Sequence, residues 1–154
     1  MANTYRFGVL GYLLIGAVCG LFFIACAVGA FLAQQYPPIA IFAVFILMGL
    51  YMVASAGSFE ISDKAVTHRN LFGTFRMAWA EVRKVELGTQ GAIILHGENK
   101  RFALAPPGYW SGRQKTEALA LLRKAVERSG AIRYSSYAAD FKIHRNVRAP
   151  AGQD

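Results

Sequence analysis

Charged side chains are missing from a long stretch near the start of the chain, where no Asp, Glu, Lys, Arg or His lies between Arg6 and Glu60. Two apolar runs fill this stretch, separated by the polar and proline-rich residues 34–38. About 20 apolar residues are enough to span the hydrocarbon core of a bilayer, and proline cannot continue a hydrogen-bonded helix. The pattern therefore predicts a transmembrane hairpin over residues 1–57, with helices at about 7–33 and 39–57.

A cleaved signal peptide is the alternative explanation of the first apolar run. Signal peptides have an apolar region of about 7 to 15 residues followed by a cleavage site with small residues. Here the run is longer, and the sequence remains apolar through Ala33. We therefore expect the segment to be retained as a membrane helix.

From Ser58 onward the pattern changes to short runs in which apolar and polar residues alternate, which is typical of half-buried strands. Six runs predict strands at Ser58–Ser62, Ala65–Asn70, Thr74–Trp79, Val82–Leu87, Ala92–His96 and Arg101–Ala105. The links between these runs are short and contain Gly, Asp or Asn, so an antiparallel meander is expected. Pro106 and Pro107 end the last strand, because proline cannot donate a hydrogen bond to a sheet.

An amphipathic helix is predicted after the strands, over Arg113–Ser129, with its apolar residues on one face and its basic residues on the other. Ser111 is a suitable N-cap, and Gly130 is a suitable stop. The helix is expected to cover the sheet. Residues 58–130 would then form one small α+β domain.

The first apolar run also carries a stripe of small residues, Gly16 and Gly20, which Ala27 roughly continues. Small residues at this spacing let two helices approach closely in lipid, where van der Waals contact drives their association. The stripe is expected to be a helix-packing surface. Its partner is either the second helix of the same hairpin or a helix of another subunit.

Basic residues flank the predicted hairpin, with Arg6 before it and Lys64, Arg69 and Arg76 after it, whereas the link between the helices is uncharged. The cytoplasmic flanks of membrane helices are enriched in Lys and Arg. We therefore expect a multi-pass protein with both termini and the sheet domain in the cytoplasm. A formal net charge of +8 also favours contact with anionic phospholipid.

Residues for catalysis or cofactor binding form no recognisable motif. His68, His96 and His144 lack metal-ligand spacing, and no histidine in the apolar runs could ligate haem. The acidic residues are explained as solvent-facing strand or turn residues: Glu60, Asp63, Glu81, Glu86 and Glu98. Because the phosphate-binding loop and nucleophile motifs are also missing, we expect no enzyme, cofactor, metal site or small-molecule substrate.

Residues 131–154 form a tail in which aromatic and basic residues are interleaved: Arg133, Tyr134, Tyr137, Phe141, Lys142, Arg145 and Arg148. Free tails are usually polar, whereas aromatic residues and arginine are enriched where proteins dock. The tail is therefore expected to contact a partner, most simply a neighbouring subunit. Nucleic acid is not an expected partner, because the chain has no motif that recognises it.

Two segments of the predicted domain resemble a known family. Phe59–Arg69 (FEISDKAVTHR) and Phe75–Val85 (FRMAWAEVRKV), placed after two spanning helices, are similar to the membrane-anchored bacterial pleckstrin-homology-like (PH-like) domain proteins. The resemblance implies a strongly bent antiparallel sheet of seven strands, of which six are counted here, closed at one corner by the C-terminal helix. It also implies binding or scaffolding rather than catalysis. Lys64, Arg69 and Arg76 match the places where relatives hold lipid headgroups.

Two functions are compatible with these features. The first is a non-catalytic accessory or assembly subunit of a larger complex in the bacterial inner membrane, respiratory or photosynthetic, which docks through its helices, domain and tail. The second is an autonomous module that binds anionic lipid at the cytoplasmic membrane surface. Only the second should weaken steeply as salt rises.

Overall fold

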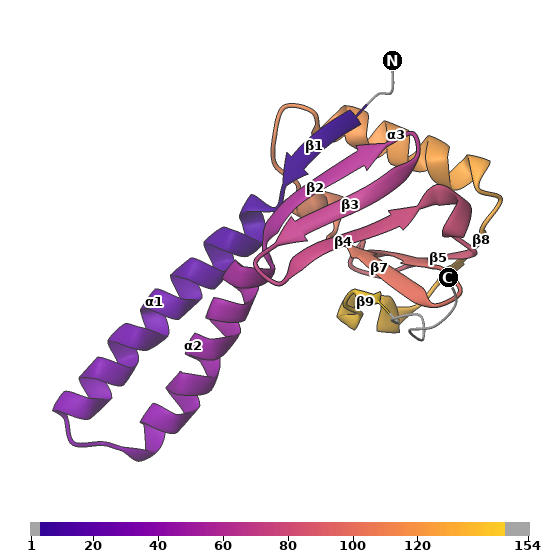
Figure 1. Cartoon of the computed structure of the whole chain (residues 1–154). Helices are drawn as coiled ribbons and strands as arrows, with labels where there is room; N and C mark the ends of the chain where they lie inside the picture. Colours follow the sequence, from indigo (N-terminus) through magenta and orange to yellow (C-terminus); the bar gives the residue numbers. More distant parts are fainter. Residues whose placement is uncertain (1–3, 147–154) are drawn as a thin grey trace, which may run out of the picture.

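The computed structural model describes residues 4–146 and shows a long helical hairpin that projects from a sheet-rich domain (Figure 1). Helix α1 spans Leu10–Leu32 and α2 spans Pro37–Ser55. Both are long and apolar enough to cross a membrane, judged by length and composition. The predicted order of a helical hairpin followed by a sheet domain is confirmed.

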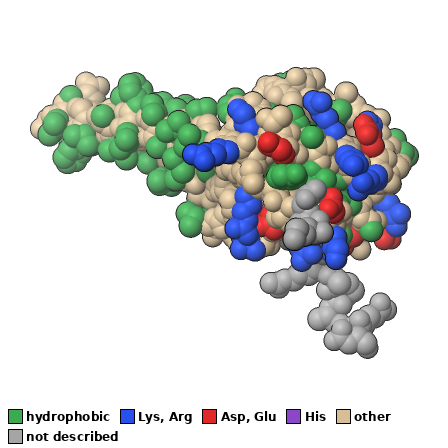
Figure 2. Space-filling view, turned by 90° about the horizontal axis from the view of Figure 1, so that it is seen from above, with side chains coloured by type: hydrophobic (Ala, Val, Ile, Leu, Met, Phe, Trp, Pro, Cys, Tyr) green, Lys and Arg blue, Asp and Glu red, His purple; other side chains and the backbone are tan. Residues whose placement is uncertain are grey.

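Exposed apolar side chains cover the hairpin, whereas the charged side chains visible in Figure 2 lie on the sheet domain. A helix pair that is apolar all round is typical of a membrane segment. Pro37 and Pro38 lie in the first turn of α2, where a backbone amide would have no helical partner, so they start this helix without cost.

Glycines form the contact between the two helices. Gly16 and Gly20 are the buried residues of α1, and Gly49 is the buried residue of α2. A Cβ atom on Gly49 would lie 2.8 Å from the carbonyl oxygen of Gly16 and 3.1 Å from the Cα of Gly20. The small-residue stripe thus packs within the hairpin at these two glycines, while Ala27 is half-buried.

Alanine at Gly49 is expected to push the helices apart and to destabilise the hairpin by about 1 to 3 kcal/mol, because its Cβ would meet backbone atoms. Gly20→Ala is the matched control, since its Cβ would find no described atom within 4 Å. Thermal unfolding of both variants in detergent, followed by helical circular dichroism, checks this. Equal stabilities of the two variants would contradict the expected packing.

The domain contains two sheets. The first has the order β1 (Thr4–Gly8), β2 (Gly57–Ser62), β3 (Ala65–Asn70) and β4 (Gly73–Ala78), all antiparallel. The second has the order β8 (Ile132–Ser135), β5 (Lys84–Leu87), β6 (Ile93–His96), β7 (Lys100–Leu104) and β9 (Arg145–Asn146). The six predicted strands are present as β2 to β7, each within two residues of its expected bounds.

The prediction of one antiparallel meander is wrong in two respects. The short 3₁₀ helix η1 (Trp79–Glu81) separates β4 from β5, so two sheets form instead of one. Strand β8 comes from the tail and pairs with β5 in parallel. The tail thus extends a sheet to which it was not assigned.

The core lies between the two sheets and under helix α3 (Lys115–Arg128), which packs against β1 and β2. Inward residues of the alternating strands, such as Ile61, Val66 and Val85, are at most 1% exposed. Phe7 of β1 stacks on Trp110, with 3.9 Å between the ring centroids. Helix α3 lies within the predicted range Arg113–Ser129 and covers the sheet as expected, but its N-cap is Gln114, not Ser111.

The first helix, α1, begins at Leu10, not near Phe7, because residues 4–8 form strand β1. This strand pairs with β2, so that Arg6 lies opposite Glu60 and Gly8 lies opposite Ser58. The hairpin is consequently an insertion between two paired strands of the domain. The boundary at residue 57 assigned from the sequence does not separate the hairpin from all of the sheet.

Candidate functional site

The C-terminal tail covers the outer face of the second sheet. After β8 it forms the 3₁₀ helix η3 (Tyr137–Phe141) and then strand β9, which pairs with β7 at the opposite edge. Ala139 of η3 is completely buried. Strands β5 and β6 therefore have both faces covered, with Val85 and Leu95 toward the main core and Glu86 and Ile94 toward the tail.

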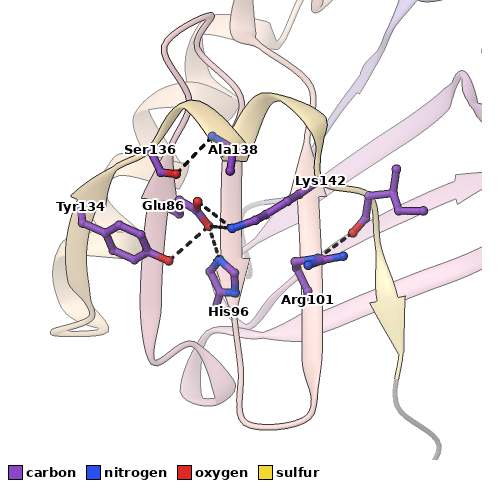
Figure 3. A network of polar contacts seen from close by, with 8 residues as sticks. Glu86, His96, Arg101, Tyr134, Ser136, Ala138 and Lys142 are labelled. Atoms are coloured by element: carbon purple, nitrogen blue, oxygen red, sulfur yellow. Dashed lines mark hydrogen bonds and ion pairs between the residues drawn. The ribbon is translucent and has the colours of Figure 1, made fainter.

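Glu86 is the centre of a polar network under the tail (Figure 3). The Nζ of Lys142 donates to both carboxylate oxygens of Glu86, over 2.7 and 2.6 Å. The Nε2 of His96 lies 2.7 Å from Oε2, and the Tyr134 hydroxyl donates to the same oxygen over 3.2 Å. Two residues of the tail are thus fixed to one carboxylate of β5.

The expectation that Glu86 faces solvent is wrong, because this side chain is 1% exposed. Burial alone raises the pKa of its carboxyl, but hydrogen bonds from Lys142, His96 and Ser136 outweigh burial and lower the pKa to about 2. The carboxylate is therefore charged at neutral pH, and Lys142 balances its charge. The contacts of Glu86 with Tyr134 and Lys142 bind the tail to strand β5. We call this network the tail clamp.

A second contact holds the tail to the loop between β5 and β6. The Thr89 hydroxyl donates to Asp140 over 2.8 Å, and the backbone N–H of Gln90 donates to both carboxylate oxygens over 3.2 and 3.1 Å. These bonds fix the C-terminal end of η3, whereas Tyr134 is fixed before its start. The tail segment from Tyr134 to Asp140 is therefore held at both ends.

His68 of β3 and His144 of the tail contact each other, although 76 positions separate them in the sequence. The Nδ1 of His68 lies 2.7 Å from the Nε2 of His144. His68 stacks on Phe59 with 3.9 Å between the ring centroids, and His144 stacks on Phe75 with 4.5 Å. Burial lowers the pKa of both imidazoles to about 4, so both are neutral at pH 7.

Hydrogen bonds determine where the protons of this pair lie. The backbone N–H of Ala103 donates to the Nδ1 of His144 over 3.1 Å, so this nitrogen carries no proton. The proton of neutral His144 is then on Nε2, which donates to the Nδ1 of His68. His68 must carry its own proton on Nε2, and this buried N–H has no hydrogen-bond partner among residues 4–146.

His68 and His144 belong to the lining of a partly open cavity of about 410 Å³ at the junction of the hairpin and the domain. We name it the junction cavity. The last turns of α2 contribute Tyr51, Met52 and Ser55 to its lining, and the tail contributes residues 140–144. Its volume is within the range of ligand-binding pockets.

Exposed apolar side chains gather around this cavity. Tyr51, Phe72, Phe141 and Ile143 line it and are 49%, 57%, 67% and 60% exposed. Such a group of exposed apolar residues marks a surface that contacts membrane or protein. Because Tyr51 belongs to α2, this surface continues the apolar surface of the hairpin.

The sequence-predicted contact residues fall into three groups. Arg69 and Arg76 are exposed on the first sheet, and Lys64 is exposed in the turn between β2 and β3. Tyr134 and Lys142 bind Glu86 of the same chain. The remaining tail residues within the described range are exposed: Arg133, Tyr137, Phe141 and Arg145. Arg148 lies outside the described residues.

The sequence alone does not indicate that His68 meets His144 or that Glu86 binds the tail. Their spacing carried no signal, because the fold brings distant segments together. One clue was available for Glu86, since it lies next to Val85 in a strand that the tail could cover. Covering both faces of a strand removes the usual alternation of buried and exposed positions.

No protein-family model, curated protein or solved structure matches the chain. Residues 4–146 contain no group of three or more His, Cys, Asp or Glu side chains that could hold a metal ion. The hairpin, the tail clamp and the junction cavity are therefore the features from which function can be inferred.

Proposed function

We propose that the chain is a non-catalytic interaction protein anchored by α1 and α2 in the bacterial inner membrane, as an accessory or assembly subunit of a larger membrane complex. The observation that carries the proposal is the rigid joint between an apolar hairpin and a sheet domain. A domain held in one orientation at the membrane surface is suited to dock against a neighbouring protein.

Hydrogen bonds and ring contacts make this joint rigid at both helices. On the α1 side, Gly8 and Ser111 exchange two backbone hydrogen bonds of 3.0 and 2.9 Å, and Tyr12 stacks on Tyr109. On the α2 side, the N–H of Leu71 donates to the carbonyl of Ala54 over 3.2 Å. Only Ala56 separates α2 from β2, so the joint contains no flexible linker.

The pairing of β1 with β2 supports a topology in which the N-terminus and the sheet domain lie on the same side of the membrane. Gly8 precedes α1 and pairs with Ser58, which follows α2. A hairpin whose two ends belong to one sheet must return to the side from which it entered. The basic flanking residues favour the cytoplasmic side for both ends.

The strand count supports a PH-like domain. Within residues 4–146, seven strands precede α3, in one group of four and one group of three, and α3 packs against β1 and β2. The strand that the sequence count lacked is β1, which stands before the membrane hairpin. In this proposal the hairpin interrupts a PH-like domain after its first strand.

The exposed groups near the base of the hairpin are the proposed docking surface. Leu71 and Phe72 form the turn between β3 and β4 and are 82% and 57% exposed. The exposed tail residues Tyr137 and Phe141 extend this apolar area on the other sheet. Aromatic residues are typical of the buried centres of protein interfaces.

Binding of anionic lipid by Lys64, Arg69 and Arg76 is less well supported. Arg69 is the last but one residue of β3, at the end of the strand that lies near the helical hairpin. Lys64 lies just before the opposite end of this strand. Five positions along the chain separate Lys64 from Arg69, which corresponds to about 17 Å in an extended strand. The three residues therefore lie at different heights along the sheet and do not form one headgroup site.

The experiment is a pull-down from native membranes in mild detergent, through a tag on the N-terminus, with washes at high salt. We expect a larger membrane complex to be recovered at a fixed ratio to the chain, because packed interfaces resist salt. Recovery of the chain with lipid alone would overturn the subunit proposal and favour the lipid module.

Two variants locate the docking surface in the same experiment. The double variant Leu71→Ser and Phe72→Ser is expected to reduce recovery of the complex at least tenfold, since both side chains are exposed at the base of the hairpin. Lys64→Ser, at the far end of the sheet, is the matched control and should keep full recovery. Equal recovery with both variants would place the docking surface elsewhere.

A further inference from the structure

His68, which belongs to the lining of the junction cavity, carries one buried polar atom that the described part of the chain does not satisfy. The Nε2–H of His68 is a buried donor without a partner in the described part of the chain, and His68 is 4% exposed. Buried donors in folded proteins are nearly always paired with protein or with a bound molecule. An acceptor from outside the chain would remove this cost.

We propose that the junction cavity holds one acyl chain of a bilayer phospholipid, with the ester carbonyl accepting a hydrogen bond from the Nε2–H of His68. This inference rests on the proposed membrane anchoring and does not depend on the identity of a protein partner. The lipid would act as a structural ligand between the hairpin, the sheets and the tail.

The position of the cavity favours a lipid over a solute from the aqueous phase. Tyr51, Met52 and Ser55 of the last turns of α2 line it, so it lies where a spanning helix leaves the bilayer. Phe72 contacts Tyr51 with 5.6 Å between the ring centroids. An acyl chain can therefore pass from the apolar surface of α2 into the cavity without crossing water.

The chemistry of the lining favours the acyl chain and its ester over a charged headgroup. The lining is mostly apolar and aromatic, with Phe59, Phe75 and Ile94 among its residues. Its two charged members have partners, since Lys142 binds Glu86 and Asp140 binds Thr89 and Gln90. Among the other polar members of the lining, which include Tyr12, Tyr51, Ser55 and Asn70, His68 carries the buried atom without a partner in the described part of the chain. A mostly apolar space with such a donor fits an alkyl chain with one carbonyl oxygen.

The test uses the full chain in nanodiscs that contain a phospholipid with a photoactivatable diazirine on one acyl chain. After irradiation, mass spectrometry maps the crosslinked residues. We expect crosslinks on the hairpin and, in addition, on the tail segment 140–144 that lines the cavity. Diester and diether forms of the same lipid are compared, because only the diester carries the carbonyl acceptor.

Two substitutions distinguish the cavity from general lipid contact. Ala105→Trp places a large side chain in the cavity lining, and Ala80→Trp makes the same change at an exposed site outside it. We expect Ala105→Trp to reduce tail crosslinks at least tenfold and Ala80→Trp to leave them unchanged. His68→Phe keeps an aromatic ring against Phe59 and removes the donor, so it should abolish a roughly tenfold preference for diester lipid.

Each remaining outcome overturns the inference in a distinct way. Crosslinks confined to the hairpin show an anchored protein without a lipid in the cavity. Tail crosslinks with no preference for the diester, or a preference that persists in His68→Phe, remove the role of the His68 donor. If the hairpin itself is not crosslinked, the membrane anchoring fails together with the inference. Should Ala105→Trp not fold, the comparison of diester with diether in His68→Phe decides.

Discussion

Lys142→Met is expected to detach the C-terminal tail from the second sheet at a cost of about 3 kcal/mol, because it leaves the buried Glu86 carboxylate without its balancing charge. His96 of β6 would still contact the carboxylate, so strands β5 to β7 should remain paired. Amide hydrogen exchange of the full chain in detergent measures the effect. A loss of this size corresponds to about 100-fold faster exchange in β8 and β9.

Lys100→Met is the matched control for this substitution. The Nζ of Lys100 also lies 2.9 Å from a carboxylate, that of Glu81, but both side chains of this pair are about 40% exposed (41% and 42%). Exposed ion pairs contribute about 0 to 1 kcal/mol. Exchange in β8 should therefore be unchanged in Lys100→Met, and similar behaviour of the two variants would contradict the clamp.

The hairpin, the six strands and α3 could be predicted from the sequence because each carries its own local pattern. The absence of charge between Arg6 and Glu60 marks the two long apolar helices, and alternation marks strands such as Ala65–Asn70. Such patterns indicate which side chains of a segment face an apolar environment. They do not report which segments become neighbours.

Elements that depend on distant partners could not be predicted. Strand β1 has only five residues and directly precedes an apolar helix, so its pattern merges with the helix. The tail contains aromatic residues that were assigned to a partner, but Tyr134 and Lys142 bind the chain's own β5. Glu86 was misassigned for the same reason, because the tail that buries it lies about 50 residues further along the chain.

The histidine pair of the candidate site is the clearest example of this limit. In the sequence, His68 and His144 are two isolated residues without metal-ligand spacing. In the fold they share a hydrogen bond, because His144 directly precedes β9, which pairs with β7, and its ring contacts Phe102 of β7 and Phe75 of β4, the strand next to β3. Their chemistry, two neutral imidazoles in an apolar environment, exists only after the tail has docked.

Acidification from pH 7.5 to pH 5 is expected to destabilise the sheet domain by about 4 kcal/mol, roughly 2 kcal/mol for each of His68 and His144. Burial lowers both pKa values to about 4 in the fold, whereas unfolded histidine titrates near 6.5. Between these values the unfolded chain binds more protons than the folded chain. The stability of the neutral pair is therefore complete above pH 6.5 and is lost progressively as pH falls toward 4.

The buried carboxylate of Glu86 does not compete in this pH range, because hydrogen bonds outweigh burial and lower its pKa to about 2. Urea unfolding of the full chain in detergent, followed by the fluorescence of the buried Trp79 and Trp110, measures the effect. The double variant His68→Phe and His144→Phe should lose most of the dependence on pH, while His96→Gln should keep it. A wild-type stability that is flat from pH 7.5 to pH 5 would show that these imidazoles are not held neutral under the tail.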